Sequence, residues 1–355
     1  MDTPRPTIAW RDVQGRPAEP EHESALRLPL RRRTIERIVV PLDGSPLAEA
    51  ALPHAAAIAR AFGAEVLLLS VAEPPPGSLG GADCAQSRLA RAELAAYLDG
   101  VVGRLAGLGV AASREVAEGR ASEQILRFAE ERNGDLMVLS THGRGGLTEF
   151  DLSGTASKVL RAVGCSVLVA RAGTAGPSEG VAAYGRVLVP VDCSMRSNWA
   201  VHLAGTIARA QGAELVLGTV VRRPEVLGNA EAQAEAAPLV ERLLRMNNDV
   251  ARRHLHRLAG GVAHAGLVVQ ERVVDGEHVG QALERLAAGE DCALIVLSAH
   301  GGSPEMDWPF GSAANLLLEH ATRPVLVLQD AVMKRRAVRA AQEIESAAAL
   351  PPGWT

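Results

Sequence analysis

Apolar runs of strand length alternate along the chain with longer segments whose apolar residues recur at helical spacing. In the first half of the chain, strands and helices are therefore expected in turn. The predicted strands are Ile38–Pro41, Val66–Val71, Ala111–Val116, Leu136–Ser140 and Val167–Ala170, and the predicted helices are Leu47–Phe62, Ser87–Leu105, Ala121–Arg132 and Gly154–Ala162. This alternation predicts an α/β fold with a doubly wound parallel sheet, right-handed crossovers and helices on both faces.

The same pattern occurs a second time. The segment that starts at Arg37, RIVVPLDGS, aligns with the segment that starts at Arg186, RVLVPVDCS, and further on VLSTHGRGG aligns with VLSAHGGS. We therefore predict two tandem Rossmann-like domains, each with a mostly parallel five-stranded sheet. The expected division is a mobile extension over residues 1–35, a first domain over 36–172, a linker over 173–184, a second domain over 185–330 and a helical tail over 331–355.

Composition and charge limit the class of protein. The chain has 355 residues, of which 47% are hydrophobic and 22% charged, so it can bury a sizeable core. A net charge of −4 gives no basic surplus of the kind that nucleic-acid binders carry. No apolar run reaches the length of a membrane span, and the N-terminal segment lacks the hydrophobic stretch of a secretory signal. We expect a cytoplasmic protein that binds neither nucleic acid nor membrane.

Glycine-bearing turns between a strand and a helix are the candidate ligand-binding segments. The stretch LSTHGRGGLTEFDLSGTASKVL has two such turns before a predicted helix, and glycine lets backbone N–H groups approach an anion such as phosphate. The turns could equally be the tight connections that any α/β fold requires. PLDGS and THGRGG both follow predicted strands, and ligands of doubly wound sheets bind at the carboxyl ends of strands.

In order and spacing, these motifs resemble the universal stress protein family in its tandem two-domain form. The family has an ATP signature, G-x2-G-x9-G-[S/T], an aspartate after strand one and a last strand of the type PVLVV. The second copy follows the signature from Ser298 to Ser312 with nine residues between its turns. The first copy follows it from Ser140 to Thr155 with ten. Serine replaces the family's first glycine in both copies, and the second copy has Cys193 where the first has glycine.

The resemblance implies an ATP site in each copy, with ATP bound alone or with Mg²⁺, and a regulatory role in stress with little or no turnover. No catalytic residue or metal ligand is predicted, because the sequence has no Ser/His/Asp order, no paired carboxylates and no histidine partner at ligand spacing. The implied nucleotide-binding residues are Pro41, Asp43, Gly44, Val71, Ser140, His142, Gly143, Arg144, Gly154 and Thr155 in the first copy, and Pro190, Asp192, Val220, Ser298, His300, Gly301, Gly311 and Ser312 in the second.

Each implied role has a structural alternative. Asp43 and Asp192 could accept hydrogen bonds from ribose or adenine, or could cap the helix that follows. The hydroxyls that open the last helices could bind phosphate or cap those helices, and the valines at the ends of the second strands could flank adenine or belong to the core. The histidines fit turn-stabilising residues better than general bases. For the whole protein, an interaction scaffold with lapsed sites and a weak ATPase are the alternatives.

The last strand of each copy, SVLVA or PVLVL, would be an apolar sheet edge. By the resemblance we expect these edges to pair with each other within one chain. A homodimer and an unidentified protein partner are further possibilities.

The two nucleotide sites are predicted to be unequal. The first carries Arg144 and Lys158, whereas the second loop carries Glu305 and Asp307, so the first should hold phosphate better.

Overall fold

The computed structural model describes residues 35–73, 85–141, 154–171, 180–226, 229–263, 266–301 and 309–329. Nearly all of the predicted N-terminal extension, most of the predicted linker and the predicted C-terminal helical tail lie outside these ranges. The strands are β1 (Arg37–Pro41), β2 (Glu65–Ala72), β3 (Ala112–Glu118), β4 (Leu136–Ser140), β5 (Ser166–Ala170), β6 (Arg186–Pro190), β7 (Glu214–Val221), β8 (Val269–Asp275), β9 (Leu294–Ser298) and β10 (Val325–Leu328). The five strands predicted for the first copy are confirmed.

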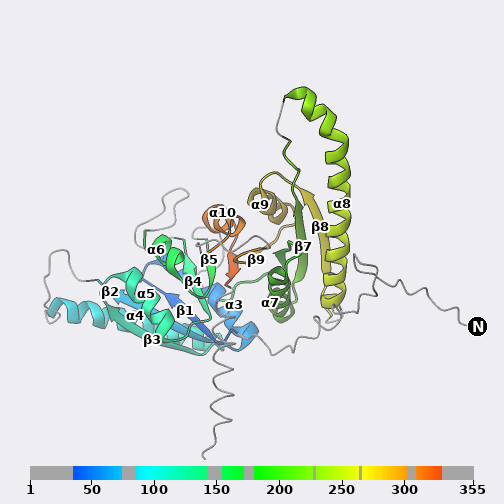
Figure 1. Ribbon diagram of the computed structural model, residues 1–355. Coiled ribbons are helices and arrows are strands. Elements are labelled where there is room, and N and C mark those ends of the chain that lie inside the picture. Colours follow the sequence, from blue (N-terminus) through cyan, green and yellow to red (C-terminus); the bar gives the residue numbers. More distant parts are fainter. Residues whose placement is uncertain are drawn as a thin grey trace, which may run out of the picture. The chain divides into compact units, whose positions relative to one another are not determined.

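All these strands belong to one ten-stranded sheet with the order β3-β2-β1-β4-β5-β10-β9-β6-β7-β8 (Figure 1). Within each half the pairs are parallel, as predicted. The halves join where β5 and β10 pair antiparallel, with Leu168 opposite Leu326. This confirms that the two predicted edges cover each other within one chain.

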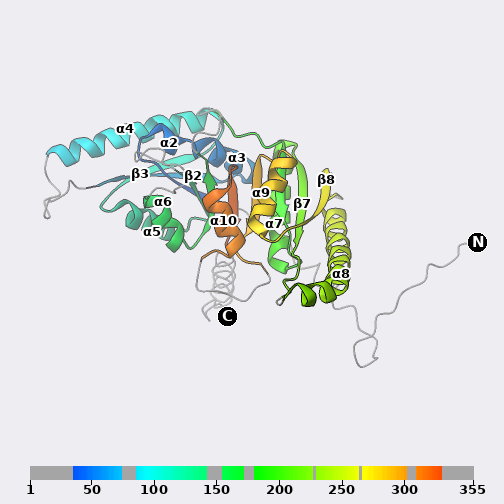
Figure 2. The same cartoon turned by 90° about the horizontal axis from the view of Figure 1, so that it is seen from above.

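The helices cover both faces of the sheet, and Figure 2 shows α4 and α5 on opposite faces of the first half. Side chains along the strands alternate between two cores, so that Ile38 and Val40 face one core and Val39 faces the other. One core contains residues of α3 (Leu52–Phe62), α4 (Ala85–Gly107), α7 (Met195–Gln211) and α8 (Ala230–Ala263). The other contains residues of α5 (Ala121–Glu131), α6 (Gly154–Ala162), α9 (Val279–Gly289) and α10 (Ser312–His320).

The single helix predicted over Leu47–Phe62 is wrong. The structure has α2 (Pro46–Glu49) and then α3, with a turn between them. Pro53 lies in the first turn of α3, and proline has no N–H to continue the hydrogen bonds of a preceding helix. The repeat alignment places His202 at this position in the second half, where α7 runs without interruption.

A partly buried arginine also joins the halves. Arg171 follows β5, and its Nη2 donates to the carbonyl oxygens of Leu317 and Leu318, at 2.7 and 2.9 Å, near the end of α10. Burial lowers the pKa of Arg171 to about 10, against the opposing effect of nearby Glu284. A cation at the C-terminus of a helix is favourable because the last carbonyls carry partial negative charge.

Candidate functional site

The strand order reverses between β1 and β4 in the first half and between β6 and β9 in the second. At such a point the connections leave in opposite directions and open a crevice at the carboxyl ends of the strands. Pro41 and Pro190 end β1 and β6, while Ser140 and Ser298 end β4 and β9. The fold therefore brings the ends of β1 and β4 together in the first half, and the ends of β6 and β9 in the second, where such a crevice is expected.

Both candidate aspartates fix the turn that they begin. In the first half, Asp43 Oδ1 accepts from the backbone N–H of Ser45 at 2.9 Å, and Ser45 Oγ caps α2 by accepting from Ala48 N at 3.1 Å. In the second half, Asp192 Oδ1 accepts from Ser194 N at 3.1 Å, and Ser194 Oγ accepts from the N–H three residues later. Serine is thus the helix cap in both copies, and the aspartate orients the turn before it.

A buried hydroxyl in the second strand ties this turn to the sheet. Ser70 Oγ donates to the carbonyl of Leu42, and Thr219 Oγ1 donates to the carbonyl of Val191, both at 2.8 Å. Neither Ser70 nor Thr219 is among the residues predicted from the sequence. The repeat places a hydroxyl at the same position of both second strands, which are otherwise apolar. Because a buried hydroxyl needs a hydrogen-bond partner, this pattern could have revealed the two residues.

The residue after each aspartate adopts a left-handed backbone. Gly44 has φ 79° and Cys193 has φ 65°. Glycine reaches this region at little cost, whereas a residue with a Cβ is strained there by roughly 1 kcal/mol or more. The second crevice therefore keeps the turn geometry of the first at the expense of local strain.

The glycine turn of the second copy is held by several hydrogen bonds. Ser298 Oγ donates to the carbonyl of His300 at 2.9 Å, and Gly311 N donates to the carbonyl of Ala299 at 2.7 Å. Arg196 Nη1, from α7, donates to the carbonyl of Gly301 at 3.1 Å. Gly301 also touches the aspartate across the crevice, because a Cβ built there would lie 2.1 Å from Asp192 Oδ2.

The last helices begin where the signature places them. Gly154 and Thr155 open α6, and Gly311 is the N-cap of α10, with Ser312 as its first residue. No side chain caps α10 among the described residues. Because the first N–H groups of a helix have no partner within it, this end can accept an anion. His142, Gly143 and Arg144 lie outside the described residues, so the second copy alone displays the glycine turn.

Side chains from the helix after the second strand lie within electrostatic range of each aspartate, and they differ between the halves. Near Asp43, Tyr97 donates its hydroxyl to Glu49 at 2.8 Å, and Arg104 pairs with Glu49 at 2.9 Å. In this group the Glu49 carboxylate binds both the Tyr97 hydroxyl and the Arg104 guanidinium.

Near Asp192, α8 contributes His254 and Arg257 instead. Burial lowers the pKa of His254, and Arg257 lowers it further. Burial raises the pKa of the Cys193 thiol, and Asp192 raises it further, against the opposing effect of Arg257. Arg196, which binds the glycine turn, and Arg257, within electrostatic range of Cys193 and His254, were not predicted from the sequence, because α7 and α8 lie far along the chain from the glycine turn.

Comparison with known proteins shows the family of the chain. The model of the universal stress protein family matches residues 34–171 and 183–329. The chain belongs to the universal stress protein family. A universal stress protein of Methanocaldococcus jannaschii is 33% identical over 139 residues, which are 38% of this chain and 82% of that protein. One of Thermus aquaticus is 33% identical over 137 residues, 38% of this chain and 97% of that protein.

Solved structures agree on the fold. A universal stress protein from Archaeoglobus fulgidus has a TM-score of 0.58 and 18% identity, over 83% of this chain and 97% of that one. A structure from Pseudomonas aeruginosa has a TM-score of 0.59 and 18% identity, over 86% of this chain and 98% of that one. These matches extend across both halves of this universal stress protein and support its two-domain α/β architecture.

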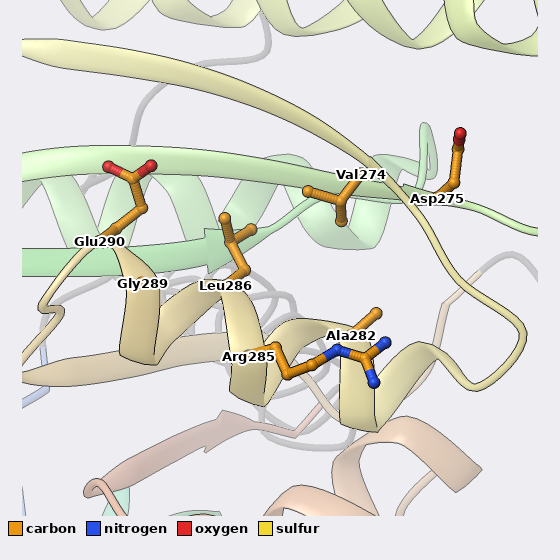
Figure 3. Close-up of a pocket in the computed structure, with 7 residues that line it drawn as sticks. All are labelled: Val274, Asp275, Ala282, Arg285, Leu286, Gly289 and Glu290. Atoms are coloured by element: carbon orange, nitrogen blue, oxygen red, sulfur yellow. The ribbon is translucent and has the colours of Figure 1, made fainter.

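A hollow of about 320 Å³ lies elsewhere in this universal stress protein, between β8 and α9 (Figure 3). It runs from Asp275, at the carboxyl end of β8, to Glu290, whose carbonyl accepts from Arg186 at the start of β6. Leu286 packs against Gly218, where a Cβ would lie 2.7 Å from its Cδ2. The hollow thus lies where α9 packs on β7 and β8, and it is separate from the candidate nucleotide crevice of the second half. Its lining residues are Val274, Asp275, Ala282, Arg285, Leu286, Gly289 and Glu290.

Two further candidate residues are valines in the second strand of each half. Val71 and Val220 sit near the carboxyl ends of β2 and β7, half-buried, and pack against the core beneath α5 and α9. Among the described residues, no group of histidine, cysteine or acidic side chains could hold a metal ion. No helix in the described part of this universal stress protein is long and apolar enough to cross a membrane.

Proposed function

We propose that this universal stress protein binds ATP or a closely related adenine nucleotide at its two crevices and acts as a regulatory module with little or no turnover. One observation carries the proposal. In the second half, an oriented aspartate, a hydrogen-bonded glycine turn and the N-terminus of α10 converge at the point where the strand order reverses. A nucleotide needs these groups, because its sugar offers hydroxyl donors and its phosphates accept N–H groups.

The residues present fit such a ligand. Asp192 Oδ1 holds the turn, which fixes the carboxylate for accepting a ribose hydroxyl, and Asp43 has the same arrangement in the first half. Gly311 and Ser312 present the open end of α10, and Gly154 and Thr155 present the start of α6. Val71 and Val220 offer half-buried apolar surface of the kind on which a base stacks.

Electrostatics support phosphate binding at the second crevice. Arg196 reaches the glycine turn, and Arg257 lies within electrostatic range of Asp192 and Cys193. An arginine near a phosphate supplies charge-assisted hydrogen bonds, which are about twice as strong as neutral ones. Bound nucleotide would therefore link α7, α8 and α10. By linking these helices, the nucleotide would alter the surface that the protein offers to a partner.

Equilibrium dialysis of the full chain against ATP, with and without Mg²⁺, tests the proposal. We expect saturable binding, nucleotide in the denatured supernatant of the purified protein, and phosphate release no faster than a blank. The absence of binding at about millimolar ATP would contradict the proposal.

A second candidate is an interaction scaffold whose sites have lapsed. The contact between Asp192 Oδ2 and Gly301 favours it, because it brings the two sides of the second crevice together. The serines at Ser140 and Ser298, in place of the family's glycine, point the same way. ATP that co-purifies with the protein would count against this candidate.

A further inference from the structure

Helix α8 has two apolar faces, and the sheet covers only one of them. Val240, Leu244, Ala251 and Leu255 are buried. The second face is a seam of four exposed residues: Leu239 at 60%, Leu243 at 38%, Met246 at 55% and Val250 at 51% exposed. Large apolar side chains scattered singly are normal on a surface, whereas a contiguous set usually marks an interaction site.

The spacing of the seam is that of a coiled coil. Its residues are separated by four, three and four positions, which are the a and d positions of a heptad repeat. The corresponding helix of the first half, α4, shows only Leu89 as an exposed large hydrophobic residue among its described side chains. The seam is therefore a feature of α8 and not of the repeat.

The seam also lies in an accessible place. α8 is the longer helix, with 34 residues against 23 in α4. In both Figures 1 and 2, α8 lies at the periphery of the coloured elements. A second helix can therefore approach the exposed face of α8 without displacing the sheet.

We propose that the seam binds the same seam of a second copy of this chain, with the two α8 helices antiparallel about a two-fold axis. In that register Leu239 packs against Val250 of the second copy, and Leu243 packs against Met246 of the second copy. Each contact is repeated by the symmetry, so four residues per chain form a closed, self-complementary core.

The flanking charges favour this partner and this direction. Arg242 and Asp249 lie beside the seam at equivalent heptad positions, both exposed and without a hydrogen bond or ion pair in the described part of the chain. In an antiparallel pair these positions face each other, so Arg242 of each copy meets Asp249 of the other. A parallel pair in the same register would not bring these opposite charges together at these positions.

The interface is small, so association should be weak. Four side chains per copy bury less surface than a stable protein interface, and we expect a Kd on the order of 10 µM to 100 µM. The dimer is thus a concentration-dependent state, separate from the pairing of β5 and β10 within one chain.

Sedimentation equilibrium of the full chain, from about 1 µM to about 300 µM, tests the proposal. We expect the wild type to approach the mass of a dimer. Leu243→Glu should weaken dimerisation at least about 10-fold, because it places a charge in the core of the pair. Arg242→Asp and Asp249→Arg should each weaken it about 3-fold or more, and the double variant should recover most of the loss.

Two matched controls separate the seam from general surface effects. Leu89→Glu changes an exposed leucine of α4, and Arg252→Asp reverses an exposed charge on the opposite side of α8, so neither should alter the mass. Equal thermal midpoints would show that the variants are folded. A wild type that stays monomeric, or a dimer indifferent to Leu243→Glu and to the charge exchange, would overturn the proposal.

Discussion

Asp43 and Asp192 end the first strand of their halves and fix the following turn through the same hydrogen bond. Their surroundings differ. The first is close to a hydrogen-bonded tyrosine, glutamate and arginine, and the second to a histidine and an arginine of α8. The comparison teaches that duplication has kept the backbone of the crevice, while the side chains that approach it from the helix after the second strand have diverged.

The contact that joins the halves should give the largest effect on stability. Arg171→Ala removes two hydrogen bonds from a partly buried cation to carbonyls of α10, and we expect about 3 kcal/mol lower stability. Arg171→Lys should recover part of this, since lysine keeps the charge but not the planar group. Urea unfolding measures the change. Arg161→Ala, on the exposed surface of α6, is the control and should leave the midpoint unchanged.

Acid should destabilise the protein through His54, at a position where the second half has Leu203. Burial lowers the pKa of His54 to about 4, and its Nδ1 is 2.8 Å from Tyr184 Oη. The neutral imidazole is thus favoured by folding. Its stabilisation is present above the usual pKa of 6.5 and is lost as the pH falls toward 4, by about 2 kcal/mol at about pH 5.

His54→Leu tests this, because it installs the residue that aligns in the second half, Leu203. Urea unfolding at several pH values should show a shallower loss of stability between about pH 6.5 and about pH 5 than in the wild type. If stability falls equally with pH in the wild type and in His54→Leu, then His54 is not the source of the acid sensitivity.

The glycine turn of the second crevice should tolerate no side chain. Gly301→Ala would place a Cβ 2.1 Å from Asp192 Oδ2, so we expect a loss of about 2 kcal/mol or a displaced aspartate. Asp192→Ala combined with Gly301→Ala should remove the clash. A double-mutant cycle by thermal unfolding that shows simple additivity would contradict the contact.

The smallest expected effect compares the residues after the two aspartates. Gly44→Ala should lower stability by about 1 kcal/mol, because alanine is strained at φ 79°. Cys193→Gly should raise it by about 0.5 kcal/mol, since relief of strain slightly exceeds the entropy that glycine loses. Cys193→Ala keeps the strain and is the control for loss of the thiol. We expect the change in stability to be negative for Gly44→Ala and positive for Cys193→Gly; changes of the same sign would contradict this account.

Much of this architecture was readable from the sequence. Apolar runs such as that of β4 predicted the strands, and the apolar edges predicted the pairing of β5 with β10. The carboxyl-end position of Asp43 and Asp192 followed from the same pattern. The split between α2 and α3 was missed because helical periodicity passes through the turn, and Pro53 was the signal that could have revealed it.

Side chains that approach the crevice from distant elements were not readable. Arg196 and Arg257 come from α7 and α8, and only the packing of those helices brings them near Asp192. The prediction that the first site holds phosphate better rests on Arg144 and Lys158 against Glu305 and Asp307, and of these only Lys158, in α6, lies within the described residues. It stays a prediction, and its charge argument is weaker now that the second crevice has these two arginines.

ATP titration of isosteric aspartate variants tests the central claim most directly. Asparagine can keep the hydrogen bond from Ser45 N or Ser194 N to its Oδ1, while its NH2 group, which is a donor, replaces the second carboxylate oxygen, which is an acceptor. We predict that Asp43→Asn and Asp192→Asn each remove about one of two binding sites, that the double variant loses binding about 10-fold or more, and that Asp99→Asn, on the surface of α4, changes nothing. ATP binding that is unchanged in the double variant, or absent from the wild type, would contradict the account.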